Sequence, residues 1–167
     1  MLVYLLAKVA VQQTLEGLAV AGLVAGHFIV SPTGRFAVAH AGWRGAVAHI
    51  ARKAACELAA CDAAEAGQVD VGSYNAYIGP HIRSECFECG DEVVQAFRRE
   101  FGKLAVADPR HVDLSAALFA DLERAGLDPE RIIDAGVCTM CHPDEYFSYR
   151  ASGGTCGRHG AIAVRLV

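Results

Sequence analysis

The feature that most constrains the fold is a strand pattern that ends in a small-residue turn and continues into an amphipathic helix. Residues 35–40 alternate in polarity, residues 41–42 follow with little side-chain bulk, and residues 44–61 place apolar side chains three and four positions apart. The apolar positions of this helical pattern are Val47, Ile50, Ala54, Leu58 and Cys61. A strand that passes directly into such a helix predicts a mixture of strands and helices and excludes a helical bundle.

Further strand-rich segments surround this unit. Ser31-Pro32-Thr33-Gly34 has the chemistry of a turn, so residues 35–40 are expected to complete a hairpin. Additional strands are expected within residues 3–11, 18–30, 75–78, 132–137 and 161–167.

Two more helices are expected in the second half of the chain. Asp91 is placed to cap a helix that carries Val94, Phe97 and Phe101 on one side. The next helix begins near Asp113 and stops at Gly126, a residue that readily adopts the left-handed conformation of a helix end. This order of elements predicts an α+β (mixed α/β) fold in which residues 1–167 form a single domain.

Composition excludes several classes of protein. Hydrophobic residues make up 53% of the 167 residues and the formal net charge is -4, which excludes a disordered chain and gives no basic footprint for nucleic acid. The apolar stretch at residues 18–30 is shorter than the roughly 20 residues needed to span a bilayer. An odd number of cysteines, 7, without a signal-peptide pattern favours a reducing compartment. A cytoplasmic protein that does not enter the membrane is therefore expected.

The first candidate site is the junction between the strand and the helix. His40 ends the strand, Trp43 offers an aromatic face, and the planar guanidinium of Arg44 suits phosphate or carboxylate. Backbone N–H groups at the start of the following helix would point at a bound ligand. An isolated histidine at a strand end is commonly a structural residue, but its grouping with tryptophan and arginine between two glycines favours a binding site.

Two Cys-x-x-Cys pairs form the second candidate site. Cys86 and Cys89 make one pair, and Cys138 and Cys141 make the other. Four thiolates would suit a tetrahedral zinc ion, and a single pair would suit dithiol redox chemistry. The pairs are farther apart than in compact zinc modules, and a thioredoxin-like context is missing, so buried, unreactive thiols are the favoured interpretation.

The third candidate site lies near the carboxyl terminus. Ser148, Tyr149 and Arg150 supply hydroxyls and a guanidinium, and the glycine-rich residues 153–158 supply backbone N–H groups. Together they form a plausible phosphate cradle, with a solvated loop as the alternative. The sequence has no P-loop, nucleophile-elbow or dinucleotide-binding motif, so those three classes of enzyme lack support.

Taken together, the three clusters resemble the laccase-domain family, whose members are described as multicopper polyphenol oxidoreductases and as zinc-dependent purine nucleoside phosphorylases with adenosine deaminase activity. The resemblance extends over residues 17–167. It rests on Ala-His-Ala-Gly-Trp-Arg-Gly at residues 39–45, Gly-Pro through Cys-Phe-Glu at 79–88, Cys-Thr at 138–139 and Phe-Ser-Tyr-Arg at 147–150. It implies a layered α/β/β/α fold with mixed sheets.

The resemblance also implies substrates, a cofactor and roles for single residues. The substrates would be a purine nucleoside, such as adenosine or inosine, and phosphate, and the cofactor would be zinc rather than copper. His40 would bind the metal and take part in catalysis. Arg44, Ser148 and Arg150 would position phosphate, while Trp43 or Tyr149 would stack on the purine.

The sequence departs from the family at the metal site, which takes two histidines and a cysteine. Only His40 matches plainly. The segment with the first histidine has no counterpart, so the chain is expected to be shortened at its N-terminus. One alignment places His27 at the position of the cysteine, where a nitrogen ligand would replace sulfur, and another places Leu23 there and leaves no ligand. His27 is therefore a candidate second metal ligand.

Three functions follow from these observations. The leading one is a zinc-dependent purine nucleoside phosphorylase with adenosine deaminase-like activity. The first alternative is a truncated, catalytically impaired member that serves as a binding or oligomerising domain, because strands without their covering segment would need a partner, such as a second copy of the chain. The second alternative is a copper-dependent polyphenol oxidase, which the scarcity of grouped histidines disfavours.

Overall fold

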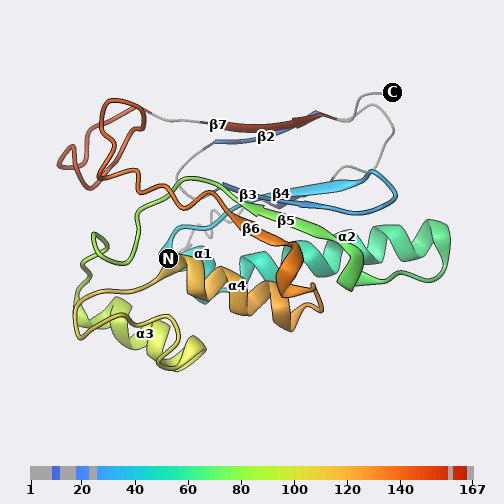
Figure 1. Ribbon diagram of the computed structural model, residues 1–167, viewed down its shortest axis with the longest axis horizontal. Helices are drawn as coiled ribbons and strands as arrows, with labels where there is room; N and C mark the ends of the chain where they lie inside the picture. Colours follow the sequence, from blue (N-terminus) through green and yellow to red (C-terminus); the bar gives the residue numbers. More distant parts are fainter. Residues whose placement is uncertain (1–8, 12–17, 23–25, 158–159, 165–167) are drawn as a thin grey trace, which may run out of the picture.

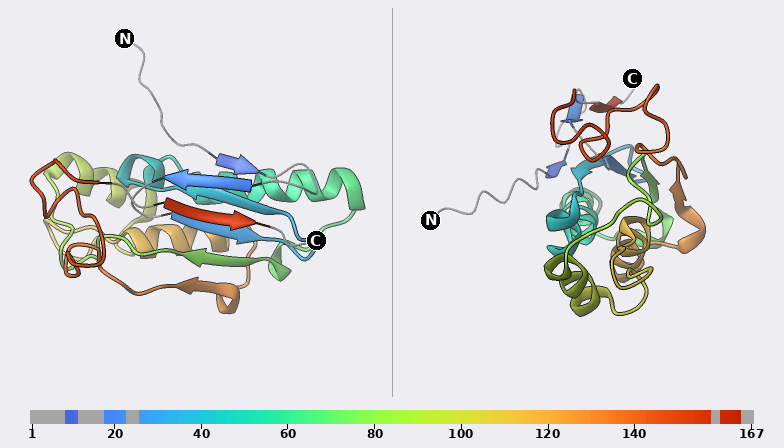
Figure 2. Two further views of the ribbon diagram at one scale, coloured as in Figure 1. Left: turned by 90° about the horizontal axis from the view of Figure 1, so that it is seen from above. Right: turned by 90° about the vertical axis from the view of Figure 1, so that its left-hand side faces the viewer.

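The elements are arranged in three layers, as the computed structural model shows (Figure 1). The structure describes residues 9–11, 18–22, 26–157 and 160–164. A five-stranded sheet lies in the middle, a layer of helices covers one of its faces, and a two-stranded sheet lies over the other (Figures 1 and 2). The strands are β1 Val9–Val11, β2 Leu18–Gly22, β3 Gly26–Val30, β4 Phe36–His40, β5 Asn75–Ile78, β6 Ile132–Asp134 and β7 Gly160–Val164.

Strand direction in the larger sheet determines where the loops meet. The strand order is β1-β4-β3-β5-β6, and β3 is antiparallel to both β4 and β5, while β5 and β6 are parallel. Strands β4, β5 and β6 therefore run in one direction, and their carboxyl ends lie along the same edge of the sheet. Strand β3 begins at that edge, where Gly26 pairs with His40.

The β3–β4 hairpin confirms the turn predicted at residues 31–34. The N–H of Gly34 donates to the Ser31 carbonyl at 3.0 Å, and Gly34 has a positive φ of 83° that favours glycine. Along both strands, alternate side chains face opposite sides. Ile29 joins the main core under the helices, whereas Phe36 and Val38 form a small apolar cluster on the other face.

Within the described residues, four α-helices form the helical layer, and two short 3-10 turns connect it to the sheet. Helix α2 packs on β4, β1 and β3, and α4 packs on α2 and β6. The main core between them and the sheet includes Leu58, Leu118 and Leu122, all fully buried. The helices are α1 Trp43–Val47, α2 Ile50–Ala66, α3 Asp91–Phe101 and α4 Leu114–Arg124, and the turns are η1 Val71–Ser73 and η2 Pro129–Arg131.

The single helix predicted at residues 44–61 is wrong in one respect, because it is two helices. The backbone breaks at His49, which adopts a left-handed conformation with φ of 57°. The His49 ring lies 2.8 Å from Asp121 Oδ1 on α4 and 3.5 Å from Glu100 Oε2. These contacts with residues distant in the sequence offset the backbone strain at the break.

The helix ends confirm one predicted cap and correct another. Asp113 caps α4 by accepting a hydrogen bond from the N–H of Ala116 at 3.0 Å, and Gly126 ends the segment with φ of 101°. Asp91 was expected to cap α3, but Gly90 occupies that position and Asp91 is the first helical residue. Its carboxylate lies in the first turn, where the positive end of the helix dipole favours a negative charge.

Several predicted strands are shorter in the structure. The strand expected at residues 132–137 ends at Asp134, because the chain turns at Gly136, whose N–H donates to Asp134 Oδ1 at 2.9 Å. The strand-rich segment predicted at residues 3–11 contains β1, and the one predicted at 18–30 contains β2 and β3. The segment predicted at 161–167 overlaps β7. The remaining parts, residues 3–8, 23–25 and 165–167, lie outside the described residues.

The predicted fold class, α+β with layered mixed sheets, is confirmed. The helices of the described residues all lie on one side of the five-stranded sheet (Figure 1). The second helical layer that the resemblance implies is not among the elements of the described residues. None of the described helices combines the length and the apolar character needed to cross a membrane.

Candidate functional site

The candidate site lies at the edge of the sheet where β4, β5 and β6 end. The chain leaves β4 toward α1, and the loops after β5 and β6 gather at the same end of the molecule (Figure 2). His81 and Cys138 form an isolated parallel bridge between these two loops. Ligands of sheets with parallel strands bind characteristically at the carboxyl ends of the strands.

A close backbone contact holds this edge together. The N–H of Gly79 donates to the carbonyl of Gly26 at 2.9 Å, which ties the end of β5 to the start of β3. A Cβ added at Gly79 would lie 2.9 Å from that same carbonyl oxygen. The glycine of the Gly79-Pro80 pair is therefore required for the close approach of the two strands.

A cavity of about 270 Å³ opens at this edge. It is lined by residues from the β4–α1 connection and from the loops after β5 and β6. Most of the cavity wall is apolar, and one side of it carries hydroxyl groups and a positively charged side chain. The lining residues are Gly42, Trp43, Ile82, Phe87, Leu114, Thr139, Ser148, Tyr149 and Arg150. The structure therefore brings together Trp43, Ser148, Tyr149 and Arg150, which sequence analysis selected from two separate clusters.

The polar side of the cavity is formed by residues 148–150. The Ser148 side chain is buried and its Oγ accepts a hydrogen bond from the N–H of Ala151 at 3.3 Å. The guanidinium of Arg150 donates to the carbonyl of Glu88 and lies 5.6 Å from the ring of Phe87. Arg150 is thus held against the loop after β5, with its positive charge at the cavity wall.

Gly154 positions the neighbouring aromatic ring. It has a positive φ of 104°, and a Cβ added there would lie 3.3 Å from the hydroxyl of Tyr149. The N–H of Gly154 also donates to the carbonyl of Tyr149 at 3.0 Å. A glycine at this position allows the loop to fold back on the Tyr149 ring, which is 60% exposed and available to a ligand.

Arg44 lies outside the cavity lining. It is exposed, and its guanidinium carbon lies 4.4 Å from the centre of the Trp43 ring in a cation–π contact. Arg44 therefore lies over the ring of Trp43 and does not form part of the cavity wall. Its predicted role in phosphate binding stays a prediction.

His40 and His27 lie on adjacent strands at the same edge. A Cβ added at Gly42, which lines the cavity, would lie 3.5 Å from Nε2 of His40. His27 is fully buried, and among the described residues neither of its ring nitrogens has a hydrogen-bond partner. Burial, and secondly the charge of His40, lower the pKa of His27 to about 4. Its imidazole is therefore neutral at pH 7, the form that binds metals.

The two histidines are a partial set of metal ligands. The unpartnered nitrogens of His27 fit a metal or another polar group in that space. Strand alternation, however, places His27 on the helix-facing side with Ile29 and His40 on the side of Val38. Within the part of the chain that the structure describes, no third ligand joins them. These residues alone do not complete a zinc site.

The cysteines group differently from the sequence prediction. Cys86, Cys138 and Cys141 lie together, with their sulfur atoms all within 4.8 Å of one another. Cys89 interacts instead with Arg150, so the alternative of four thiolates around one zinc ion, which the sequence disfavoured, does not match the structure. The interpretation as buried thiols is also wrong in part, because Cys138 is buried while Cys141 is exposed.

Sequence analysis missed a polar network behind the cavity. His81 Nε2 and a guanidinium nitrogen of Arg83 lie 2.8 and 2.9 Å from Oγ of Ser115, which donates to Asp134 Oδ2 at 2.7 Å. Arg83 also pairs directly with Asp134. Neighbours of these residues in the chain, Ile82 and Leu114, line the cavity. The one sequence signal was the position of His81 directly after Gly-Pro at a strand end.

Comparison with known proteins places the chain among relatives. Residues 19–165 match the family model described as multi-copper polyphenol oxidoreductase laccase. The chain is 37% identical over 135 residues to adenosine deaminase RL5 from an unknown prokaryotic organism, covering 77% of this chain and 49% of that protein. It is 33% identical over 132 residues to a purine nucleoside phosphorylase of Bacteroides thetaiotaomicron, covering 75% and 47%.

A solved structure shares the fold. YlmD from Geobacillus stearothermophilus matches with a TM-score of 0.81 and 25% identity, over 95% of this chain and 61% of that one. The chain spans about half the length of the curated relatives it matches, 49% and 47% in the two cases above.

Proposed function

Because the chain belongs to the multi-copper polyphenol oxidoreductase laccase family, we propose that it acts on purine nucleosides, with the cavity at the ends of β4, β5 and β6 as its binding site. Relatives named as purine nucleoside phosphorylases and as an adenosine deaminase support nucleoside processing as the general function. Phosphorolysis is the specific reaction proposed, and adenosine deamination is the second candidate, favoured by the similarity to RL5.

The lining of the cavity is the observation that carries this proposal. Trp43, Phe87 and Tyr149 offer aromatic surfaces on which a flat purine can stack. Ser148 and Arg150, on the polar side, offer a hydroxyl and a cation that suit an anion such as phosphate. A mostly apolar cavity with few polar groups at one side is typical of a small-molecule site.

The proposed reaction assigns separate tasks to these two sides. Arg150 and Ser148 hold phosphate so that one of its oxygens attacks the ribosidic carbon of the nucleoside. The new bond is carbon–oxygen, the broken bond joins that carbon to the purine nitrogen, and the purine takes up a proton as it leaves. Positioning of the two reactants can remove about 7–11 kcal/mol from the barrier of such a transfer. Zinc would supply Lewis-acid chemistry in deamination, with His40 and His27 as partial ligands.

The direct test is to incubate the purified protein with adenosine or inosine and phosphate, with and without added Zn²⁺. Chromatography is expected to detect ribose 1-phosphate with adenine or hypoxanthine, and inosine where adenosine is deaminated. A parallel sample with Cu²⁺ and a phenolic dye tests the polyphenol oxidase alternative. If the folded, zinc-supplemented protein forms no nucleoside product, the enzymatic proposal is wrong.

Binding is measured independently of turnover through Trp43, the one tryptophan of the chain. Because its ring lines the cavity, a stacked purine is expected to quench the intrinsic fluorescence, with saturation as adenosine is titrated. Ribose alone serves as the control and should leave the signal unchanged. Saturable quenching without product would favour the binding-domain alternative, and no quenching would contradict the placement of the purine in this cavity.

A further inference from the structure

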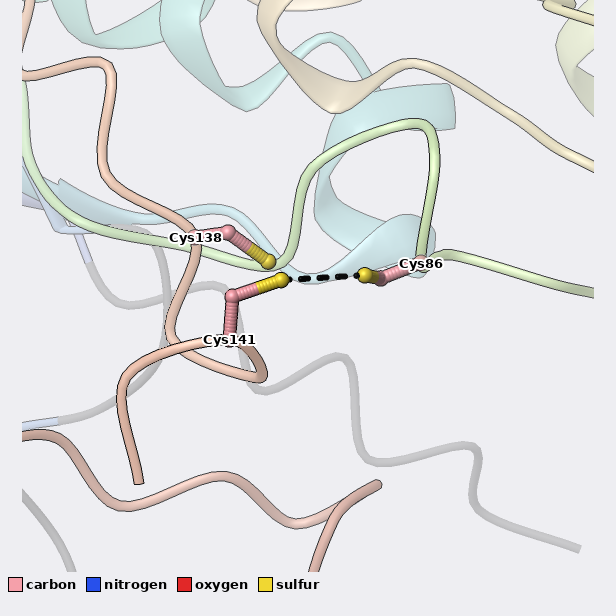
Figure 3. A group of neighbouring side chains, drawn as sticks. All are labelled: Cys86, Cys138 and Cys141. Atoms are coloured by element: carbon pink, nitrogen blue, oxygen red, sulfur yellow. Dashed lines mark hydrogen bonds between the residues drawn. The ribbon is translucent and has the colours of Figure 1, made fainter. Parts of the chain in front are cut away.

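Three cysteine side chains from two different loops point toward one another (Figure 3). Cys86 comes from the loop after β5, and Cys138 and Cys141 come from the loop after β6. The sulfur atoms of Cys86 and Cys141 are 3.4 Å apart, and all three sulfurs lie within 4.8 Å of one another. Among the described residues this is the one group of three or more potential metal ligands.

Both loops contribute backbone N–H groups near the buried sulfur of Cys138, from Met140 and Cys141 of the same turn and from Arg83 of the other loop. A cysteine that binds a metal ion releases its proton, so the ion itself drives the ionisation of the three thiols. Thiolates are the form of cysteine that binds metals.

The spacing of the sulfurs suits an ion. In a tetrahedral zinc site with Zn–S bonds of about 2.3 Å, neighbouring sulfurs are about 3.8 Å apart. The Cys86–Cys141 separation of 3.4 Å is below that value, and all three sulfurs lie within 4.8 Å of one another, so small side-chain rotations would complete three bonds. A disulfide between Cys86 and Cys141 would use two of the sulfurs and leave that of Cys138 outside the bond.

We propose that Cys86, Cys138 and Cys141 bind one thiophilic metal ion, Zn²⁺, with the fourth coordination position open to solvent beside the exposed Cys141. Three thiolates around Zn²⁺ leave one net negative charge, which water can solvate at the exposed Cys141. This site is distinct from the His40 and His27 position, and it does not depend on the proposed nucleoside chemistry.

The ion would join two walls of the cavity. Cys86 precedes Phe87, and Cys138 precedes Thr139, and both following residues line the cavity. A metal bound to the two loops would therefore hold Phe87 and Thr139 at a constant separation. The ligands lie beside the cavity wall while Phe87 and Thr139 line it, so the ion would act on the cavity through the positions of these two residues.

The test uses the reduced, metal-free protein and Co²⁺ as a spectroscopic probe, followed by competition with Zn²⁺ and, in a separate anaerobic sample, Cu(I). One equivalent of Co²⁺ is expected to produce thiolate-to-cobalt charge-transfer absorption that Zn²⁺ abolishes. Elemental analysis should find one zinc per chain after dialysis. Displacement of bound Zn²⁺ by equimolar Cu(I) is expected of thiolate ligands, whereas protein that retains no zinc after dialysis would overturn the choice of zinc.

Substitutions separate this site from the other thiols and from the histidines. Cys141→Ser is expected to weaken Zn²⁺ binding more than about 100-fold, because even changes beyond the direct ligands cost 10–100-fold. Cys89→Ser and His40→Ala are the matched controls and should retain one zinc per chain. The proposal is overturned if the reduced wild-type protein binds no metal, or if Cys141→Ser binds as tightly as Cys89→Ser.

Two further measurements keep the test independent of folding defects. Circular dichroism checks that each variant is folded before metal is added. In the wild type, Zn²⁺ should protect Cys86, Cys138 and Cys141 from alkylation, read by mass spectrometry, while the exposed Cys56 reacts as before. If Zn²⁺ leaves the alkylation of Cys86, Cys138 and Cys141 unchanged, as it does that of Cys56, the proposal is contradicted.

Discussion

Replacing Asp134 with asparagine is expected to lower the free energy of unfolding by about 2–3 kcal/mol. The carboxylate accepts hydrogen bonds from Ser115, from the N–H of Gly136 and from Arg83. Its side chain is 14% exposed and that of Arg83 is 26% exposed, so water replaces these partners poorly. The amide oxygen can still accept a hydrogen bond from Arg83, but it carries no charge, so the partly buried guanidinium loses its ion-pair partner.

Urea denaturation at pH 7 measures this loss. Asp144→Asn is the matched control, because it removes the same charge from an exposed residue farther along the same loop. The control is expected to change the free energy of unfolding by less than about 0.5 kcal/mol. Equal losses in the two variants would show that the polar network behind the cavity contributes no specific stability.

The same network predicts a pH dependence. Burial alone would raise the pKa of Asp134, but hydrogen bonds from Gly136, Ser115 and Arg83 outweigh burial and lower it. A carboxyl group whose pKa is lower in the folded state contributes its full stability above its unfolded pKa of about 3.9. That contribution is lost as the pH falls through the lower folded pKa. The stability difference between wild type and Asp134→Asn should therefore be constant from pH 7 to 5 and shrink below pH 4, as denaturation at each pH would show.

Replacing Arg150 with alanine is expected to lower kcat/KM for phosphorolysis by about 100- to 1000-fold, the typical cost of removing a group that stabilises charge in an enzyme site. In the proposed function, Arg150 supplies the positive charge of the phosphate subsite. Its contacts with the Glu88 carbonyl and the Phe87 ring hold that charge at the cavity wall. Arg150→Lys keeps the charge but loses the planar fork, so an intermediate loss is expected.

Arg110→Ala is the matched control for this experiment. Arg110 also contacts Glu88, but it pairs with the carboxylate, is 74% exposed and does not line the cavity. Its removal is expected to change kcat/KM less than about 3-fold, since exposed ion pairs contribute little. Initial rates over a range of phosphate concentrations distinguish the outcomes. Similar losses in the two variants would remove Arg150 from the phosphate subsite.

Local features of the fold were predictable because their causes lie within a few residues. The turn at residues 31–34 depends on its own proline and glycine, and the start of α4 depends on the hydrogen bond from Ala116 to Asp113. The break at His49 was not predictable in this way. It is accompanied by contacts with Glu100 and Asp121, which lie on other helices.

The candidate site shows the same division. Trp43 and residues 148–150 have side-chain types that indicate binding wherever they occur in a cavity, so their chemistry could be predicted before their positions were known. Phe87 and Thr139 carry no such signal. They line the cavity because the loops after β5 and β6 start at neighbouring parallel strands.

The sequence alone determined one passage of the fold, in which a strand ends in a small-residue turn and continues into an amphipathic helix. The exception is the break at His49. Polarity, turn residues and helix caps act through neighbouring backbone groups, so a linear pattern contains them. Which cysteine joins Cys138 and Cys141 was decided by the tertiary structure. Cys86 and Cys89 are equivalent in the motif, and only the path of the loop after β5 directs Cys86 toward the pair and Cys89 toward Arg150. Strand order controls that path, and strand order depends on contacts between residues far apart in the chain.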